Sequence, residues 1–334
     1  MAGGTNGWDA RCGRVRGGSG HALRRLVAGL FAIVGGTEVA AASAGFVVHV
    51  RDEPIRHEVF AVTAQPEEPV DIAVAGQGAG GDFRLASRSG RVVAGGDASW
   101  TWIAPASVGR RVLRVERQDA PGAIKLNVFV TLARASMDRR GRVNGYRVGH
   151  YPDRVFRGLA AYQAPQGLIE VTPANKDIRV SPHFRLGEFV SKQQGAYPRY
   201  VVLRPRLLRF LEAILAEARR VGVQAEGLTI MSGYRTPYYN ARIGQGRFSR
   251  HKWGDAADIY IDDRPPWGRM DDITGDGRSD YRDAVKLARI ASRVRRLREP
   301  DDFTGGLGVY GPRSHRGPFV HVDIRGYKAR WRHP

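Results

Sequence analysis

Two short segments near the carboxyl end of the chain alternate apolar and polar residues. In residues 256–262 aliphatic side chains alternate with polar ones that include Asp258, and in residues 319–325 the same alternation includes His321 and Asp323. A period of two is typical of half-buried strands, in which one face lies on a core and the other is polar. The pattern therefore predicts two strands that present Asp258 and His321 on their polar faces.

Helical periodicity marks two further segments. From Pro205 to Gly222, apolar residues recur three and four positions apart, with proline at the start and glycine at the end, as expected for an amphipathic helix. Residues 281–298 repeat this pattern, and residues 228–234 predict a strand that ends before Arg235. Residues 182–334 are therefore expected to form an α+β domain, an antiparallel sheet with flanking helices.

The residues before this domain have a different pattern. Residues 45–135 hold about seven short alternating runs separated by Gly, Pro and Asp clusters, without a helical segment. Such spacing predicts an all-β, immunoglobulin-like sandwich. Trp100 and Trp102 lie in one run and are expected in the core or on a sheet face. A spacer or wall-docking role for this region rests on fold analogy alone. Residues 136–181, rich in Gly, Pro and Asn, predict a hairpin and linker.

The first 44 residues resemble a secretory signal. Arg24 and Arg25 precede an apolar run of eleven residues, and Ala42-Ser43-Ala44 supplies the small residues that a signal peptidase reads. The run is too short to cross a bilayer, which needs about twenty residues. The sequence thus predicts export to a periplasmic or extracellular, cell-wall-associated location, with no transmembrane anchor after cleavage.

Charge and cysteine content limit the function classes. The formal net charge is +20, from 53 Lys and Arg against 33 Asp and Glu, spread along the chain. Such a charge attracts polyanions, but no nucleic-acid motif is present and export argues against that partner, so anionic wall material fits better. The single cysteine, Cys12, lies in the leader, which excludes disulfides and thiol catalysis in the mature protein. The sequence does not indicate an oligomeric state.

Candidate metal ligands occur around the first polar strand. His251 and Asp258 are seven positions apart, and His321 follows on the second strand. Two imidazoles and a carboxylate, with a fourth position open to water, form a donor set of catalytic zinc. Each residue could instead be an ordinary buried polar residue, but the combined pattern favours a Zn2+ site.

These residues fall into a known motif. The pattern Ser-x-His-x-x-Gly-x-Ala-x-Asp, followed by a strand His and preceded by Ser-Gly-Tyr-Arg, resembles zinc D-alanyl-D-alanine carboxypeptidases and murein endopeptidases, relatives of hedgehog domains. The resemblance covers about residues 181–331. It implies zinc ligation by His251, Asp258 and His321, substrate binding by Arg235, and peptidoglycan stem peptides or crosslinks as substrates. The five motif positions are Ser249, His251, Gly254, Ala256 and Asp258.

One departure from the family concerns the general base. Many members carry Glu three residues, or His two residues, before the last zinc His, whereas this chain has Pro318 and Phe319 there. Asp323 is the first candidate for the catalytic base and His315 the second. Asp323 could alternatively orient His321. The departure keeps open a second function, a non-catalytic wall-binding protein with a structural or degenerate zinc site.

An acidic segment between the zinc strand and the second helix matches a twelve-residue calcium loop. Gly277 stands at its sixth position, where such loops turn sharply. The sequence predicts a structural Ca2+ site there, although a solvated acidic turn would need no metal. The oxygen-bearing ligand positions are Asp272, Thr274, Asp276, Arg278 (carbonyl), Asp280 and Asp283.

Overall fold

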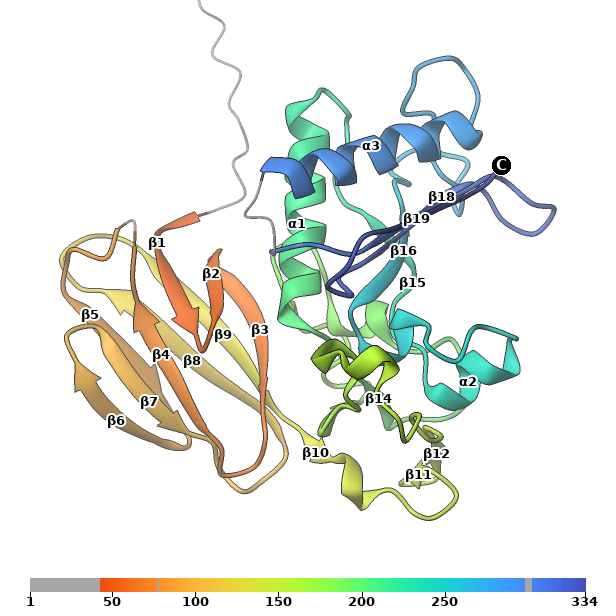
Figure 1. Cartoon of the computed structure of the whole chain (residues 1–334). Coiled ribbons are helices and arrows are strands. Elements are labelled where there is room, and N and C mark those ends of the chain that lie inside the picture. The colour runs from red at the N-terminus through yellow and green to blue at the C-terminus, as the bar shows by residue number, and fades with distance from the viewer. Residues whose placement is uncertain (1–42, 77, 298–301) are drawn as a thin grey trace, which may run out of the picture. The chain divides into compact units, whose positions relative to one another are not determined.

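The computed structural model describes residues 43–76, 78–297 and 302–334, which fall within one compact unit, Val39–Pro334 (Figure 1). The expected leader lies outside the described residues, except for its last two positions. Within the described part, no helix combines the length and apolar character that a membrane crossing needs.

The amino-terminal region is all β. Nine strands form a five-stranded sheet, in the order β2-β1-β4-β7-β6, and a four-stranded sheet, in the order β3-β9-β8-β5. Trp102 is fully buried and donates its indole N–H to Ser89 O at 2.9 Å, and Trp100 is half-buried. The strands are β1 (Ser43–Val50), β2 (Glu53–His57), β3 (Val59–Ala64), β4 (Pro69–Val74), β5 (Phe83–Ser87), β6 (Arg91–Gly96), β7 (Ser99–Ile103), β8 (Gly109–Arg117) and β9 (Ala123–Val130).

The connecting region contains short strands and single helical turns. β11 and β12 form a two-stranded hairpin, and β13 lies between β10 and β14 in a small sheet. The strands are β10 (Leu132–Ala133), β11 (Arg142–Val143), β12 (Tyr146–Arg147), β13 (Gly167–Val171) and β14 (Arg199–Val201). The 3-10 turns among the described residues are η1 (Arg134–Ser136), η2 (Phe156–Gly158), η3 (Ala160–Tyr162), η4 (Leu186–Phe189) and η5 (Arg250–Trp253).

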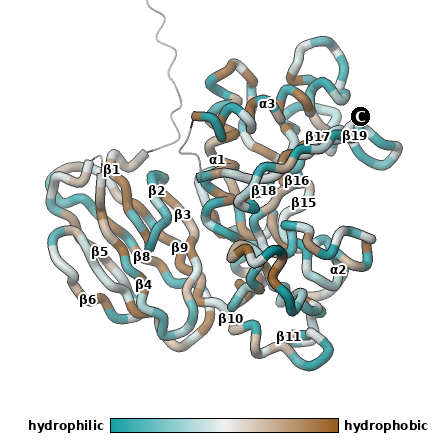
Figure 2. The backbone as a smooth tube through the Cα atoms, in the orientation of Figure 1, coloured by the Kyte–Doolittle hydropathy of each residue, from teal (hydrophilic) through white to brown (hydrophobic). Residues whose placement is uncertain are grey.

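The helices of the carboxyl-terminal region follow their sequence patterns. α1 (Pro205–Arg220) begins at its proline and buries its leucine stripe, and α3 (Tyr281–Leu297) buries most of its expected face. Val285 on this face is half-buried, and Ile290 lies in the core. A short helix, α2 (Pro237–Arg242), has Thr236 as its N-cap. Figure 2 shows hydrophobic and hydrophilic residues along α1 and α3.

The predicted sheet has five strands in the order β15-β16-β18-β17-β19. The pairs are antiparallel, except that β17 and β19 run parallel. After β18 the chain reverses direction, and β19 pairs with the edge of β17 that faces away from β18. Because β17 is antiparallel to β18, β19 runs parallel to β17. α3 packs on β17 and β18. The strands are β15 (Thr229–Ser232), β16 (Ala256–Tyr260), β17 (Gly306–Tyr310), β18 (Phe319–Asp323) and β19 (Ala329–His333).

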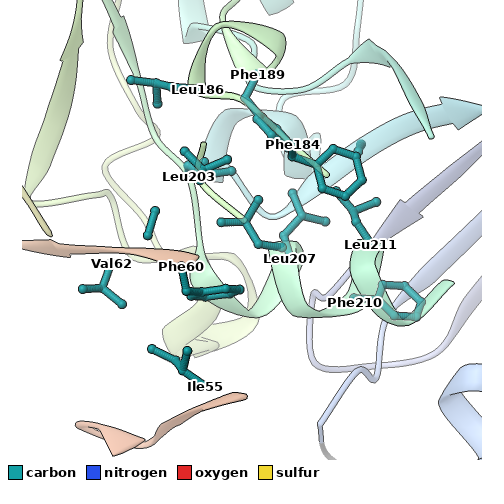
Figure 3. Close-up of a cluster of buried hydrophobic side chains, with 14 of the residues drawn as sticks. Ile55, Phe60, Val62, Phe184, Leu186, Phe189, Leu203, Leu207, Phe210 and Leu211 are labelled. Atoms are coloured by element: carbon teal, nitrogen blue, oxygen red, sulfur yellow. The ribbon is translucent and has the colours of Figure 1, made fainter. Parts of the chain in front are cut away.

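A large apolar cluster supports both regions. It includes the leucines of α1, aromatic residues before and within η4, and side chains of β2 and β3 (Figure 3). The labelled members are Ile55, Phe60, Val62, Phe184, Leu186, Phe189, Leu203, Leu207, Phe210 and Leu211.

Candidate metal centre

A row of residues crosses the carboxyl-terminal sheet at one level. Ser232 lies opposite Asp258, Asp258 opposite His321, and Gly308 between His321 and Trp331. Residues directly opposite each other on neighbouring strands bring their Cβ atoms to about 5 Å. The carboxylate of Asp258 and the imidazole of His321 therefore meet, as the alternating patterns predict.

The third residue of the cluster, His251, comes from η5, the turn before β16. Gly254 ends this turn at φ +67°, and a Cβ atom there would overlap the carbonyl oxygen of Val202. Only glycine tolerates both conditions. The glycine of the motif thus sets the path by which the chain passes from His251 into the strand that carries Asp258.

Three potential ligand atoms converge. His251 Nε2 lies 3.1 Å from His321 Nδ1 and 3.3 Å from Asp258 Oδ1, and His321 Nδ1 lies 2.8 Å from Asp258 Oδ1. All three side chains are buried. Within the described ranges they are the one group of three or more His, Cys, Asp or Glu side chains that could hold a metal ion.

Hydrogen bonds outside the cluster fix which ring nitrogens point inward. His251 Nδ1 lies 2.7 Å from Gly233 O, and His321 Nε2 lies 3.0 Å from an oxygen of Asp323. His251 Nδ1 and His321 Nε2 must carry hydrogen to donate to these oxygen acceptors. In a neutral ring the other nitrogen, which faces the cluster, therefore bears a lone pair. Two lone pairs and a carboxylate oxygen thus face one another, which requires a cation or a proton between them.

The donor set fits zinc. Zinc binds imidazole and carboxylate at about 2.0–2.2 Å in tetrahedral sites, which places ligand atoms roughly 3.3–3.4 Å apart. The three observed separations are close to this spacing. His251, Asp258 and His321 can therefore hold the ion with small side-chain shifts.

The pKa shifts of His321 and Asp258 also show that the cluster favours a positive charge between its side chains. Burial alone would lower the pKa of His321, but its hydrogen bonds with Asp258 and Asp323 raise it to about 9. Burial opposes ionisation of Asp258, yet its histidine partners hold the pKa of that carboxyl well below its usual range. Burial lowers the pKa of His251. A proton on His321 thus takes the place that a cation can fill.

Asp323 lies against the outer side of the His321 ring. Its fully buried carboxylate accepts hydrogen bonds from Gly306 N at 2.8 Å and Arg325 Nε at 2.8 Å, besides the bond from His321. These hydrogen bonds from His321 and Arg325 outweigh burial and keep the pKa of Asp323 well below its usual range. Both oxygens are occupied by donors, so the geometry favours the orienting role over proton transfer.

Arg235 contacts a ligand residue. Its terminal nitrogen donates to Asp258 Oδ2 at 2.5 Å and its Nε donates to Ser232 Oγ at 2.9 Å. Asp258 therefore presents its other oxygen to the two histidines. The second terminal nitrogen of Arg235 forms no hydrogen bond within the described part of the chain, which leaves donors for a substrate oxygen.

His315, the second candidate base, is exposed in the turn between β17 and β18. No hydrogen bond or ion pair joins it to the cluster among the residues that the structure describes. The geometry therefore adds nothing in favour of His315.

Two aromatic residues beside the cluster were missed by the sequence analysis. The Trp331 ring lies 5.2 Å from the His321 ring, and its indole N–H donates to the Tyr310 hydroxyl at 2.7 Å. A Cβ atom on Gly308 would overlap this indole. A glycine inside a strand often marks such a close approach, so Gly308 was the available signal, but it does not identify the partner.

The acidic loop shows the hydrogen bonds of a capped helix start. Asp283 accepts from Asp280 N at 2.9 Å, and Asp280 accepts from Arg282 N at 2.7 Å, so both carboxylates bind backbone N–H groups at the start of α3. Asp272 accepts from the backbone of Gly275 and Gly277. These contacts account for the acidic residues without a metal, so the structure provides no support for the predicted calcium site.

Part of this site lies in a segment that is similar to a known family. Residues 183–276 match the Peptidase M15 family, a segment that includes Arg235, His251 and Asp258 and ends before His321. The match confirms the resemblance to zinc peptidases of this type. No curated protein matches the chain.

One solved structure is similar over a limited part of the chain. It is a nucleoside hydrolase-related hypothetical protein from Saccharophagus degradans that is associated with carbohydrate metabolism. The identity is 14%, the match covers 27% of this chain and 26% of that chain, and the TM-score is 0.21. The chain thus spans about a quarter of that protein's length, and so low a score carries no argument about fold or function.

Proposed function

We propose that this chain, whose residues 183–276 match the Peptidase M15 family, is an exported zinc peptidase that hydrolyses peptide bonds of peptidoglycan stem peptides or crosslinks. The observation that carries the proposal is the convergence of three acceptor atoms, His251 Nε2, Asp258 Oδ1 and His321 Nδ1, at 2.8–3.3 Å. The family match makes zinc the ion that fits them.

The residues around the cluster have separate tasks. When bound, zinc polarises a scissile carbonyl and lowers the pKa of a water molecule. His251, Asp258 and His321 hold the ion, and Asp323 keeps His321 in the tautomer that presents Nδ1. Arg235 fixes Asp258 and offers its remaining N–H groups to a substrate carbonyl or carboxylate oxygen, where a charge-assisted hydrogen bond orients the bond to be cut.

Digestion of purified muropeptides tests this function. The mature protein, loaded with one zinc per chain, should release D-alanine from stem peptides or separate crosslinked dimers, and mass spectrometry of the products distinguishes the two. A chelator-treated sample is the control. If zinc-loaded protein leaves every muropeptide intact yet sediments with cell walls, the alternative of a non-catalytic wall-binding protein replaces the proposal.

We also propose that the amino-terminal region is an immunoglobulin-like module. The orders β1-β4-β7-β6 and β3-β9-β8-β5 correspond to the two strand sets of such a sandwich. Its place before a peptidase domain fits a spacer or wall-docking role.

Export is proposed from the first 44 residues. We expect the mature chain to begin near Gly45, because Ala42-Ser43-Ala44 provides small residues at the cleavage positions. Amino-terminal sequencing of protein recovered from outside the cytoplasm checks this. Recovery of that protein with Met1 in place would contradict a cleaved leader.

A further inference from the structure

A groove of about 860 Å³ lies on the four-stranded sheet of the amino-terminal region, β3-β9-β8-β5 (Figure 1). Along β8, Leu113 and Val115 are fully buried in the core. Because successive side chains of a strand point to opposite faces, the residues that alternate with these two lie on the outer face of the sheet. The groove lies on that outer face. Its lining includes Arg110, Arg114, Glu116, Lys125 and Asn127.

Two segments border the groove. On one side, the amide nitrogen of Asn127 donates to Arg179 O at 2.9 Å, which holds residues 178–179 against the sheet. At one end, the turn between β8 and β9 also contributes to the lining, and it is closed by a hydrogen bond from Arg117 N to Gly122 O at 3.0 Å. Hydrogen bonds thus hold both borders of the groove in place.

The lining is rich in positive charge. Five cationic side chains and two carboxylates, those of Glu58 and Glu116, give it a net charge of +3. Glu116 already pairs with Arg114 at 2.5 Å and with Arg84, outside the lining, at 2.7 Å. The other cationic residues of the lining are Arg110, Arg117, Lys125 and Arg179.

Three of these cations are available to a ligand. Arg110, Lys125 and Arg179 are exposed, and their side chains form no ion pair or hydrogen bond with any residue that the structure describes. Arg117 differs, because it pairs with Asp119 at 2.9 Å. The three unpaired side chains can therefore bind an anion without first giving up a partner.

The register of the sheet brings positive charges together. Arg114 of β8 lies directly opposite Lys125 of β9, and like charges in such a pair destabilise a sheet. Arg110 lies four residues before Arg114 on the same strand, which is about 13 Å away at the rise of a strand. An anion near Lys125 would relieve the repulsion, and a chain of anions along the groove would also reach Arg110.

The residue types of the groove indicate which kind of anionic chain fits. Arginine presents a planar fork of N–H donors that matches the oxygens of a phosphate group. None of the described lining residues is aromatic, whereas sites for single-stranded nucleic acids usually stack bases on aromatic side chains. The groove therefore favours a phosphate-bearing chain without bases.

We propose that this groove binds a linear polyol phosphate polymer, whose successive phosphodiester groups pair with Arg110, Lys125 and Arg179. The inference does not depend on the metal centre. It goes beyond the proposed peptidase function, because it gives the amino-terminal region a ligand of its own, through which an exported chain would dock on an anionic surface polymer.

Binding of poly(glycerol phosphate) to the full chain tests the groove. Calorimetry should detect binding that weakens as salt rises, because cations that contact phosphates displace counterions. The triple variant Arg110→Gln, Lys125→Gln, Arg179→Gln should bind about tenfold to a hundredfold more weakly at low salt. Its affinity should also depend less steeply on salt, since fewer phosphates are neutralised.

A second triple variant separates the groove from the net charge of the chain. Arg56→Gln, Arg88→Gln, Arg91→Gln removes the same charge from exposed residues outside the lining, and its affinity should stay within about twofold of that of the unaltered protein. Both variants should keep the melting temperature, because exposed substitutions of this kind change stability little. Equal losses of affinity in the two variants, or no binding by the unaltered protein, reject the groove.

Duplex DNA is the second probe, at the same salt concentration and the same number of phosphates. We expect it to bind more weakly than the polyol phosphate. If DNA binds as tightly and loses its affinity in the groove variant, the site takes polyanions in general, and the assignment to a polyol phosphate is overturned.

Discussion

His251→Ala should abolish both zinc binding and peptide cleavage, and His321→Ala should do the same. Each substitution leaves two protein ligands, whereas catalytic zinc sites have three. The Lewis acidity of the ion contributes several kcal/mol to such reactions, and about 1.4 kcal/mol corresponds to a tenfold change in rate. Turnover should therefore fall by about a thousandfold or more. Metal analysis of the purified variants and their rates on muropeptides measure the two losses.

His315→Ala is the matched control, because it removes an exposed imidazole that has no hydrogen bond or ion pair with the cluster in the described part of the chain. We expect it to retain one zinc per chain. A drop in its turnover with zinc retained would identify His315 as the base. Full zinc occupancy in His251→Ala would contradict the assignment of the ligands.

The meeting of Asp258 and His321 was predictable because it depends on local pattern. The alternation in β16 and β18 places Asp258 and His321 on a polar face, and their direct pairing in the sheet follows once the aliphatic face is buried. A register shift of one residue would turn these side chains to the opposite face. The burial of the aliphatic residues thus fixes the site.

The two edge strands of the five-stranded sheet were the part of the amino-terminal region that the sequence did not reveal. β2 contains a proline and charged residues, and every described residue of β6 is exposed. These two strands form the edges of the five-stranded sheet. Edge strands tolerate proline and charge, and β2 and β6 bury little apolar surface, so these two lack the alternation by which the other seven strands were found.

Contacts between segments distant in sequence account for what was missed near the metal centre. Trp331 reaches His321 only because β19 pairs in parallel with β17, and this pairing follows from the sheet order. Lys252 occupies a variable position of the motif and would be expected on the surface, but it is buried, and its carbonyl accepts a hydrogen bond from the distant Tyr151 hydroxyl. A sequence pattern reports the faces of one element and not the partner that covers it.

Asp323→Asn should weaken zinc binding by about ten- to a hundredfold, the usual cost of losing the partner that orients a metal-binding histidine. In the structure the carboxylate receives donors on both oxygens, from His321 and Arg325 among others. An asparagine NH2 group on the His321 side would face the hydrogen of Nε2. The His321 ring accepts a hydrogen bond from this NH2 group only in its other tautomer. In that tautomer the hydrogen lies on Nδ1, the atom that faces Asp258 and His251.

The same variant separates the two roles of Asp323. If Asp323 orients His321, chelator competition shows the weaker zinc affinity, and turnover largely returns when excess zinc fills the site. If Asp323 is the general base, zinc affinity stays unchanged and turnover at saturating zinc falls by about 10²–10⁴. Arg325→Gln provides a graded comparison, since it removes one partner of Asp323 and keeps the bond to His321, so its loss of zinc affinity should be smaller. Unchanged zinc affinity in Asp323→Asn, with turnover lost, would assign Asp323 to proton transfer and overturn the orienting role.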